Sequence, residues 1–96
     1  MLRIEFSTRF AKDYKRLTRK HFEMELIDEV IRLISADTKE SKIKLKKRHN
    51  MHSLKGKWTG NYECHIANIG DWLLVWKVSN HTAYMVRTGS HDDIFR

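Results

Sequence analysis

The spacing of apolar residues changes once along this 96-residue chain, and that change constrains the fold more than any other feature. Between residues 8 and 36, apolar side chains recur every three to four positions, as in amphipathic helices. From Trp58 onwards they alternate with polar residues or fill both faces of short segments, as in strands. Helices followed by strands predict an α+β fold in which the helices pack on one face of a sheet.

The first 36 residues are expected to form one strand and two helices. Residues 2–6 alternate apolar and charged side chains, which predicts a short strand. Ser7 or Thr8 can cap a first helix. Its apolar stripe consists of Phe10, Tyr14 and Leu17. A second helix is expected from about Phe22 to Ala36, and the short connection between the two predicts a helical hairpin.

Three antiparallel strands are predicted after residue 57. The first runs from Trp58, with Tyr62 and Cys64 on the same face and Glu63 and His65 on the other. The second, residues 71–78, is apolar on both faces like a central strand, and the third, residues 82–87, ends at a glycine. Residues 37–57 are expected to be a basic connector whose alternating segment, residues 42–46, supplies an edge strand or an extended stretch. We therefore expect one domain, residues 1–96, with three or four antiparallel strands after the hairpin.

The net charge of +7 is confined to one stretch. Residues 39–57 hold eight of the nineteen cations and one of the twelve anions, so the remainder of the chain is neutral. A polyanion would relieve the repulsion between these cations, which favours RNA, DNA or an acidic protein segment as partner over a merely solvated linker. The candidate RNA-binding residues are Lys42, Lys44, Lys46, Lys47, Arg48, Lys55, Lys57 and the neighbouring Trp58.

Other bulk features favour a cytoplasmic protein. No apolar run is long enough to span a membrane, and the first residues lack the pattern of a signal peptide. Cys64 is the only cysteine, so it cannot form an internal disulfide, which fits a reducing compartment.

Candidate catalytic groups gather around the predicted strands. Glu63 and His65 share one strand face, and Asp71 lies across a short turn from them. Arg87 is on the last strand, and His91 follows it. The other candidates are His52, in the connector, and Phe95, next to the last residue. By contrast, His49 is expected on the basic surface, and His21 and His81 in turns.

These residue types suit RNA cleavage, in which the ribose 2′-hydroxyl is the nucleophile. Histidine can serve as base and acid because its pKa lies near neutrality. Arginine can stabilise the phosphorane, and Phe95, Trp58 or Tyr62 can stack on a base. Three imidazoles could instead bind zinc, but the spacing here lacks a known metal-binding motif. Glu63 and Asp71 could simply pair with lysines, and Phe95 could simply fasten the C-terminus.

The sequence from His52 to Gly60, HSLKGKWTG, resembles the His-x-Leu-x-Gly-x-Trp-x-Gly segment of YafQ-type toxins, which belong to the RelE superfamily of toxin–antitoxin systems. The similarity continues through His65, the 71–77 segment DWLLVWK and the 87–91 segment RTGSH to Phe95. It extends over the full chain and is strongest after His52. Residues 67–70 form a longer stretch than in some relatives.

This resemblance implies a RelE-like fold and a ribosome-dependent mRNA endonuclease that needs no metal or other cofactor and is neutralised by a cognate antitoxin. It implies that His91 is the main acid–base group, that His65 and His52 share proton transfer or phosphate positioning, and that Asp71 and Glu63 orient these histidines. Arg87 would then stabilise the phosphorane, Phe95 would orient the nucleotide, and the lysines would dock on ribosomal RNA. Two alternatives remain: a ParE-like toxin that poisons DNA gyrase without hydrolysis, and an RNA-binding protein without cleavage.

Overall fold

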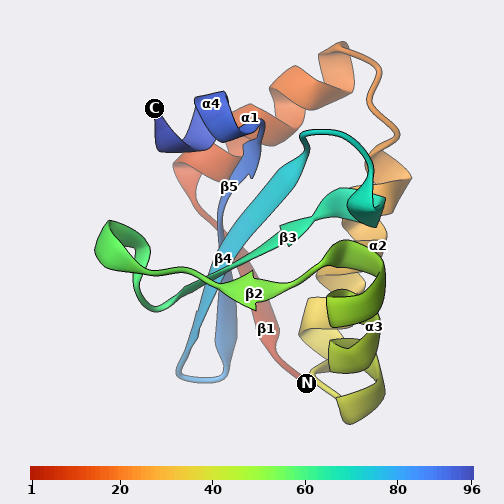
Figure 1. Cartoon of the computed structure of the whole chain (residues 1–96), viewed down its shortest axis with the longest axis vertical. Coiled ribbons are helices and arrows are strands. Elements are labelled where there is room, and N and C mark those ends of the chain that lie inside the picture. Colours follow the sequence, from red (N-terminus) through yellow and green to blue (C-terminus); the bar gives the residue numbers. More distant parts are fainter.

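The computed structural model describes all residues, 1–96, and shows a mixed α+β fold (Figure 1). In chain order the elements are β1 (Arg3–Phe6), α1 (Thr8–Arg19), α2 (Met24–Ala36), α3 (Lys39–His49), β2 (His52–Ser53), η1 (Gly56–Trp58), β3 (Asn61–His65), η2 (Ile66–Asn68), β4 (Leu73–Ser79), β5 (Thr82–Gly89) and α4 (His91–Phe95), where η marks a 3₁₀ helix. None of the helices is long and apolar enough to cross a bilayer.

The five strands form one sheet in the order β1-β5-β4-β3-β2. Strands β2 to β5 pair antiparallel, which confirms the expected antiparallel sheet and its fourth strand. The fourth strand, however, is His52–Ser53 and not the predicted residues 42–46. β1 joins the other edge and runs parallel to β5, so the sheet as a whole is mixed.

Helix α1 occupies the place along β5 where β1 stops. The Ser7 amide donates to the Met85 carbonyl at 3.0 Å, and the Ser7 hydroxyl donates to the Val86 carbonyl at 2.8 Å. The same hydroxyl accepts from the Phe10 amide at 2.9 Å and so caps the helix, as predicted. One side chain therefore ends the edge strand and starts the helix that continues along the sheet.

The two faces of the sheet bury very different amounts of apolar surface. Helices α1, α2 and α3 cover one face over a core of 14 buried residues, among them Leu74 and Trp76 of β4. The opposite face has a core of only three buried residues, Leu73, Val75 and Ile94. β4 supplies both cores, which confirms the prediction of a central strand that is apolar on both sides.

The basic connector contains a helix that the sequence interpretation missed. Thr38 and Ser41 form a reciprocal capping box, and Asn50 ends α3 in a left-handed conformation. The buried residues Ser41, Leu45 and His49 recur every four positions, so the helical period decides the conformation and the alternation over residues 42–46 was misleading. His49, expected on the surface, is only 3% exposed.

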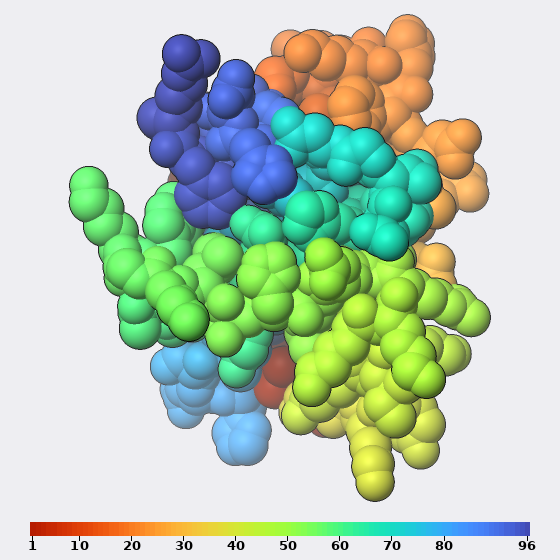
Figure 2. Space-filling model, in the orientation of Figure 1, coloured from red at the N-terminus to blue at the C-terminus, as the bar shows by residue number.

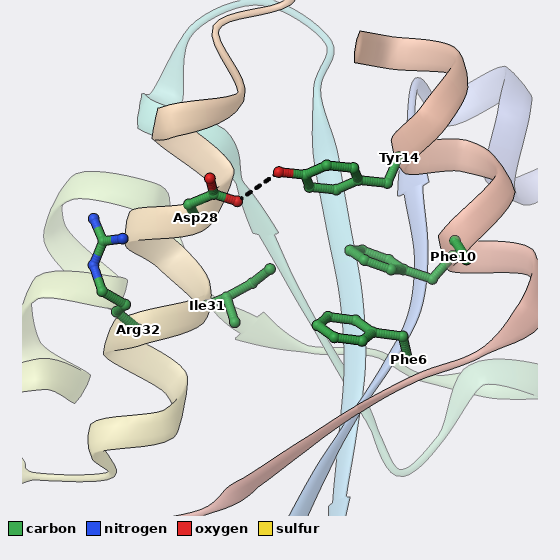
Figure 3. A pocket seen from close by; sticks show the side chains of 7 residues that line it. Phe6, Phe10, Tyr14, Asp28, Ile31 and Arg32 are labelled. Atoms are coloured by element: carbon green, nitrogen blue, oxygen red, sulfur yellow. Dashed lines mark hydrogen bonds between the residues drawn. The ribbon is translucent and has the colours of Figure 1, made fainter.

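Helices α1 and α2 follow one another as predicted, but they are splayed. α1 packs mainly on β5 and α2 mainly on α3. A groove of about 470 Å³ separates them, and the Tyr14 hydroxyl spans it to donate to Asp28 at 2.8 Å (Figure 3). Burial and this bond raise the pKa of Tyr14.

Candidate active site

Three histidines meet on the sheet face opposite the three long helices. His52 lies on β2, His65 at the end of β3 and His91 at the start of α4. The ring centroids of His52 and His65 are 6.1 Å apart, and those of His65 and His91 are 6.0 Å apart. Figure 2 shows the corresponding green, teal and blue segments in contact on one face. The structure therefore brings together the three histidines that the sequence singled out.

Glu63 lies beneath two of these histidines. Strand pairing puts His52 directly opposite Glu63, and its Nε2 lies 3.2 Å from Glu63 Oε1. The Nε2 of His65, two residues along β3, lies 3.5 Å from the same oxygen. Glu63 is only 3% exposed and these imidazoles are its only ion-pair partners, so its charge is balanced only when one of them is protonated.

His91 is held by Asp71 through two hydrogen bonds to one oxygen. The His91 amide and its ring Nδ1 donate to Asp71 Oδ1 at 3.0 Å and 2.6 Å. The hydrogen bond from the His91 backbone amide, and after it the one from the His91 ring, lowers the pKa of Asp71. Because Nδ1 donates to a carboxylate, the Nε2 of His91 is the ring nitrogen left for chemistry, and the side chain is 55% exposed.

Two aromatic rings extend the row of histidines. The rings of His91 and Phe95 are 6.1 Å apart, and Phe95 meets Trp58 edge to face at 5.1 Å. Trp58 was expected in a strand on the face of Tyr62 and Cys64, but it lies in η1 and packs near the small core under α4. The prediction failed because the Gly56 and Gly60 backbones, both at positive φ, interrupt the strand.

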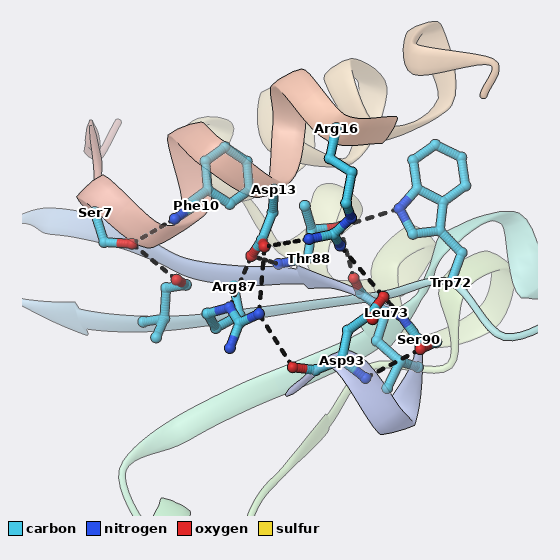
Figure 4. A network of polar contacts seen from close by, with 11 residues as sticks. Ser7, Phe10, Asp13, Arg16, Trp72, Leu73, Arg87, Thr88, Ser90 and Asp93 are labelled. Carbon is cyan, nitrogen blue, oxygen red and sulfur yellow. Dashed lines mark hydrogen bonds and ion pairs between the residues drawn. The ribbon is translucent and has the colours of Figure 1, made fainter. Parts of the chain in front are cut away.

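Arg87, predicted to stabilise the phosphorane, is largely engaged within the protein (Figure 4). Its Nε and Nη2 donate to Asp13 of α1 at 2.7 and 3.2 Å, and Nη2 also donates to the Asp93 carbonyl at 3.1 Å. Only Nη1 makes no hydrogen bond within the chain. Any contact of Arg87 with a phosphate is therefore limited to the free part of its guanidinium.

Sequence reasoning missed Asp13, which is 1% exposed. Besides Arg87, it accepts from the Thr88 amide at 3.2 Å and from Arg16 Nη1 at 3.1 Å. The signal was present, since Asp13 lies within the apolar stripe between Phe10 and Leu17, where a carboxylate needs partners.

The chain after Gly89 is ordered against the sheet. Ser90 and Asp93 form a capping box at the start of α4, and Ile94 is buried. The amide of Ser90, more than any other group, lowers the pKa of Asp93. Gly89 has φ +145°, and a Cβ there would lie 2.7 Å from Asp93 Oδ2, so the turn into α4 requires glycine.

The candidate RNA-binding cations are exposed, but two of them have acidic partners. Lys42 Nζ lies 3.3 Å from Asp37, and Arg48 Nη1 lies 3.7 Å from Glu29. The cations without an ion pair on this stretch are Lys39, Lys44, Lys46, Lys47, Lys55 and Lys57. The first four lie on α3, while Lys55 and Lys57 lie at the start of η1 and within it, just before Trp58.

The site is an open surface rather than a pocket. The three cavities of the molecule lie elsewhere, and only one of them touches a member of the site, Asp71. The histidines and carboxylates do not form a group with metal-binding geometry. What the arrangement offers is an exposed imidazole on a fixed carboxylate, two further imidazoles over a buried carboxylate, and an aromatic wall.

Comparisons with known proteins point to one family of bacterial toxins. Residues 2–96 match the family model described as the bacterial toxin of type II toxin–antitoxin systems, YafQ. The mRNA interferase toxin YafQ of Escherichia coli K12 is 28% identical over 92 residues, 96% of this chain and 94% of that protein. A copper-bound mutant toxin from Helicobacter pylori superposes with a TM-score of 0.86 at 32% identity, over 99% of this chain and 100% of that one. YafQ in the E. coli DinJ–YafQ toxin–antitoxin complex superposes with a TM-score of 0.80 at 27% identity, and both chains are covered completely. This chain therefore belongs to the YafQ family of bacterial toxins of type II toxin–antitoxin systems.

Proposed function

We propose that this chain is an endoribonuclease that cleaves mRNA on the ribosome and so blocks translation. The observation that supports it most is the row of three imidazoles, in which His65 lies about 6 Å from a histidine on either side. The similar E. coli toxin is named an mRNA interferase, which fits the same chemistry. Acid–base cleavage of RNA needs two proton-transfer groups within reach of one phosphodiester, and this row provides them.

In the proposed mechanism His91 is the principal acid–base group. Asp71 holds its Nδ1, which leaves Nε2 to accept or donate the proton, as a carboxylate does for the base of a catalytic triad. His65 and His52 share the second proton transfer or position the phosphate, and Glu63, 3.5 and 3.2 Å from their Nε2 atoms, orients them. Each proton-transfer role contributes roughly 10²–10⁴-fold in rate.

The remaining members of the site bind the substrate. Phe95, backed by Trp58, orients the nucleotide next to the scissile bond by stacking. The free Nη1 of Arg87 adds positive charge near the phosphorane, although Asp13 neutralises most of its effect. The reaction uses the 2′-hydroxyl as nucleophile and requires no metal ion.

An open site with a basic flank suits a substrate presented by the ribosome. No cavity encloses a nucleotide at the histidines, so the ribosome must supply the other wall and hold the mRNA in place. The unpaired lysines of α3 and those beside Trp58 would dock on ribosomal RNA, chiefly through phosphate contacts. The site of action is accordingly the cytoplasm. The cognate antitoxin would neutralise the protein, in line with the E. coli toxin–antitoxin complex.

The decisive experiment compares the wild type with His91→Ala and His81→Asn in cells. His81 is an exposed histidine outside the site with positive φ, which asparagine tolerates, so His81→Asn is the matched control. Mapping of mRNA 5′ ends should show cuts in register with codons for the wild type and the control, and none for His91→Ala. Full toxicity of His91→Ala would remove His91 from the mechanism.

Two further measurements separate the alternatives. Intact mRNA together with inhibited DNA supercoiling would indicate a gyrase poison instead. Since a similar H. pylori toxin is described as copper-bound, cleavage on purified ribosomes is measured with Mg²⁺ held constant, after treatment of the toxin with a chelator selective for copper and zinc, and with added copper. Activity that persists after this treatment supports metal independence of the toxin, whereas its loss and recovery with copper or zinc would refute it.

A further inference from the structure

His49, at the C-terminal end of the basic helix α3, is buried and only partly satisfied. It is 3% exposed, and its Nδ1 accepts a hydrogen bond from the Ala67 amide at 2.8 Å. Its Nε2 has no partner in the chain. Burial lowers the pKa of His49, as does Arg48, while Glu29 on the adjacent α2 opposes the shift. Because Nδ1 accepts the Ala67 amide, it carries a lone pair, and the remaining ring proton is on Nε2.

Ala67, whose amide donates to His49, lies in the loop that joins two members of the site, His65 and Asp71. β3 ends at His65, and the chain then turns through η2 to Asp71. The Ile66 amide donates to the Trp72 carbonyl at 2.8 Å and closes this loop at its base. Asp71 lies inside this closed loop, next to its base, so the path of the loop from Ala67 onwards contributes to the position of Asp71.

The backbone of this loop has an unfavourable conformation at two consecutive residues. Ala67 and Asn68 both have φ +53°, a left-handed conformation that alanine rarely adopts. Such consecutive residues persist only where surrounding contacts fix them. The bond from Ala67 to His49 is such a contact, and it crosses 18 residues of sequence.

We infer that His49 is a positioning residue of the active site: by accepting the Ala67 amide it fixes the loop that places Asp71 against His91. An apolar side chain would fill the same space without leaving a buried polar atom unpaired. Only the acceptor explains why an imidazole suits this position. For its kinetic readout the inference rests on the proposed nuclease activity.

The test moves the acceptor without removing the polar side chain. In His49→Asn the amide oxygen takes the place of Nδ1, whereas in His49→Gln it takes the place of Nε2. With mRNA on purified ribosomes, His49→Asn should keep the wild-type kcat. His49→Gln should lose about tenfold or more in kcat with KM unchanged, because displaced catalytic groups slow the chemical step. Leu45→Ala, which empties a buried position one turn earlier on α3, should lower Tm without lowering kcat.

Amide hydrogen exchange provides a readout that needs no activity. The Ala67 and His91 amides should be protected in the wild type and in His49→Asn, and should exchange faster in His49→Gln. Equal kcat in the Asn and Gln variants, whether normal or reduced, would overturn the inference. If the Gln variant does not fold, hydrogen exchange of the wild type tests the inference. The Ala67 and His91 amides should then exchange with the same free energy of opening, and different values would overturn the inference. If the wild type does not cleave mRNA, the proposed function fails, and exchange alone tests the role of His49.

Discussion

The substitution Asp13→Asn tests directly whether the buried ion pair between Asp13 and Arg87 stabilises the fold. It keeps the size of the side chain and removes its charge, leaving the guanidinium of Arg87 without its counter-ion. The Asp13 side chain is 2% exposed and that of Arg87 12%, so solvent screens this pair little. Removal of one partner from a buried pair costs about 3–5 kcal/mol. Asparagine can also accept only some of the donors that now converge on the carboxylate.

Such a loss is large beside the total stability of a domain of this size, about 5–15 kcal/mol. Urea denaturation followed by tryptophan fluorescence should show a lower free energy of unfolding with an unchanged m-value. Each kcal/mol lowers Tm by about 4–8 °C at this length, so Tm should fall by at least about 12 °C.

Arg16→Gln is the matched control on the same network. Arg16 contacts Asp13 at 3.1 Å, but its side chain is 37% exposed, and exposed pairs contribute about 0–1 kcal/mol. The control should therefore lose at most about 1 kcal/mol. If Asp13→Asn loses no more than Arg16→Gln, the carboxylate does not hold α1 to β5 in the way the geometry implies.

Three other outcomes are expected. Gly89→Ala should lower the free energy of unfolding by about 1–3 kcal/mol in urea denaturation, because its Cβ would lie 2.7 Å from Asp93 Oδ2 and φ +145° strains alanine; normal stability would contradict the tight turn. The hydrogen bonds from His91 lower the pKa of Asp71. The anchoring of His91 should therefore be complete above the ordinary carboxyl pKa of about 3.9 and be lost only as the pH falls through the depressed pKa. A ¹³C NMR titration of the Asp71 carboxyl measures this. Burial, the largest effect, raises the pKa of the Cys64 thiol, so iodoacetamide at pH 8 should leave it unmodified in the native protein and alkylate it in urea; rapid native alkylation would show that β3 opens readily.

The parts of the fold that depend on local pattern were predictable from the sequence. The Ser7 cap and the doubly apolar β4 needed only short-range spacing, and both are confirmed. α3 was missed because exposed lysines surround a single buried row, and an apparent alternation hid its helical period. The engagement of Arg87 by Asp13 joins residues 74 positions apart, and no short-range pattern reveals such a partner.

For the site, the sequence predicted which histidines would meet, and the structure adds how they are held. The pairing of Glu63 with two imidazoles follows from the β2–β3 register, which the sequence interpretation did not contain because it placed β2 elsewhere. The catalytic roles of the individual histidines stay predictions until the variants are measured.

The unequal burial on the two sheet faces means that the elements on the two faces need not unfold at the same temperature. His91 and Phe95 belong to a five-residue helix whose buried side chain is Ile94, on the side with the smaller core. Release of this helix would take away the exposed imidazole and the stacking ring, while the helices over the larger core stay folded. Heating should therefore abolish activity at a lower temperature than it melts the protein, and the toxin would become inactive well before it became a substrate for proteases that need an unfolded chain.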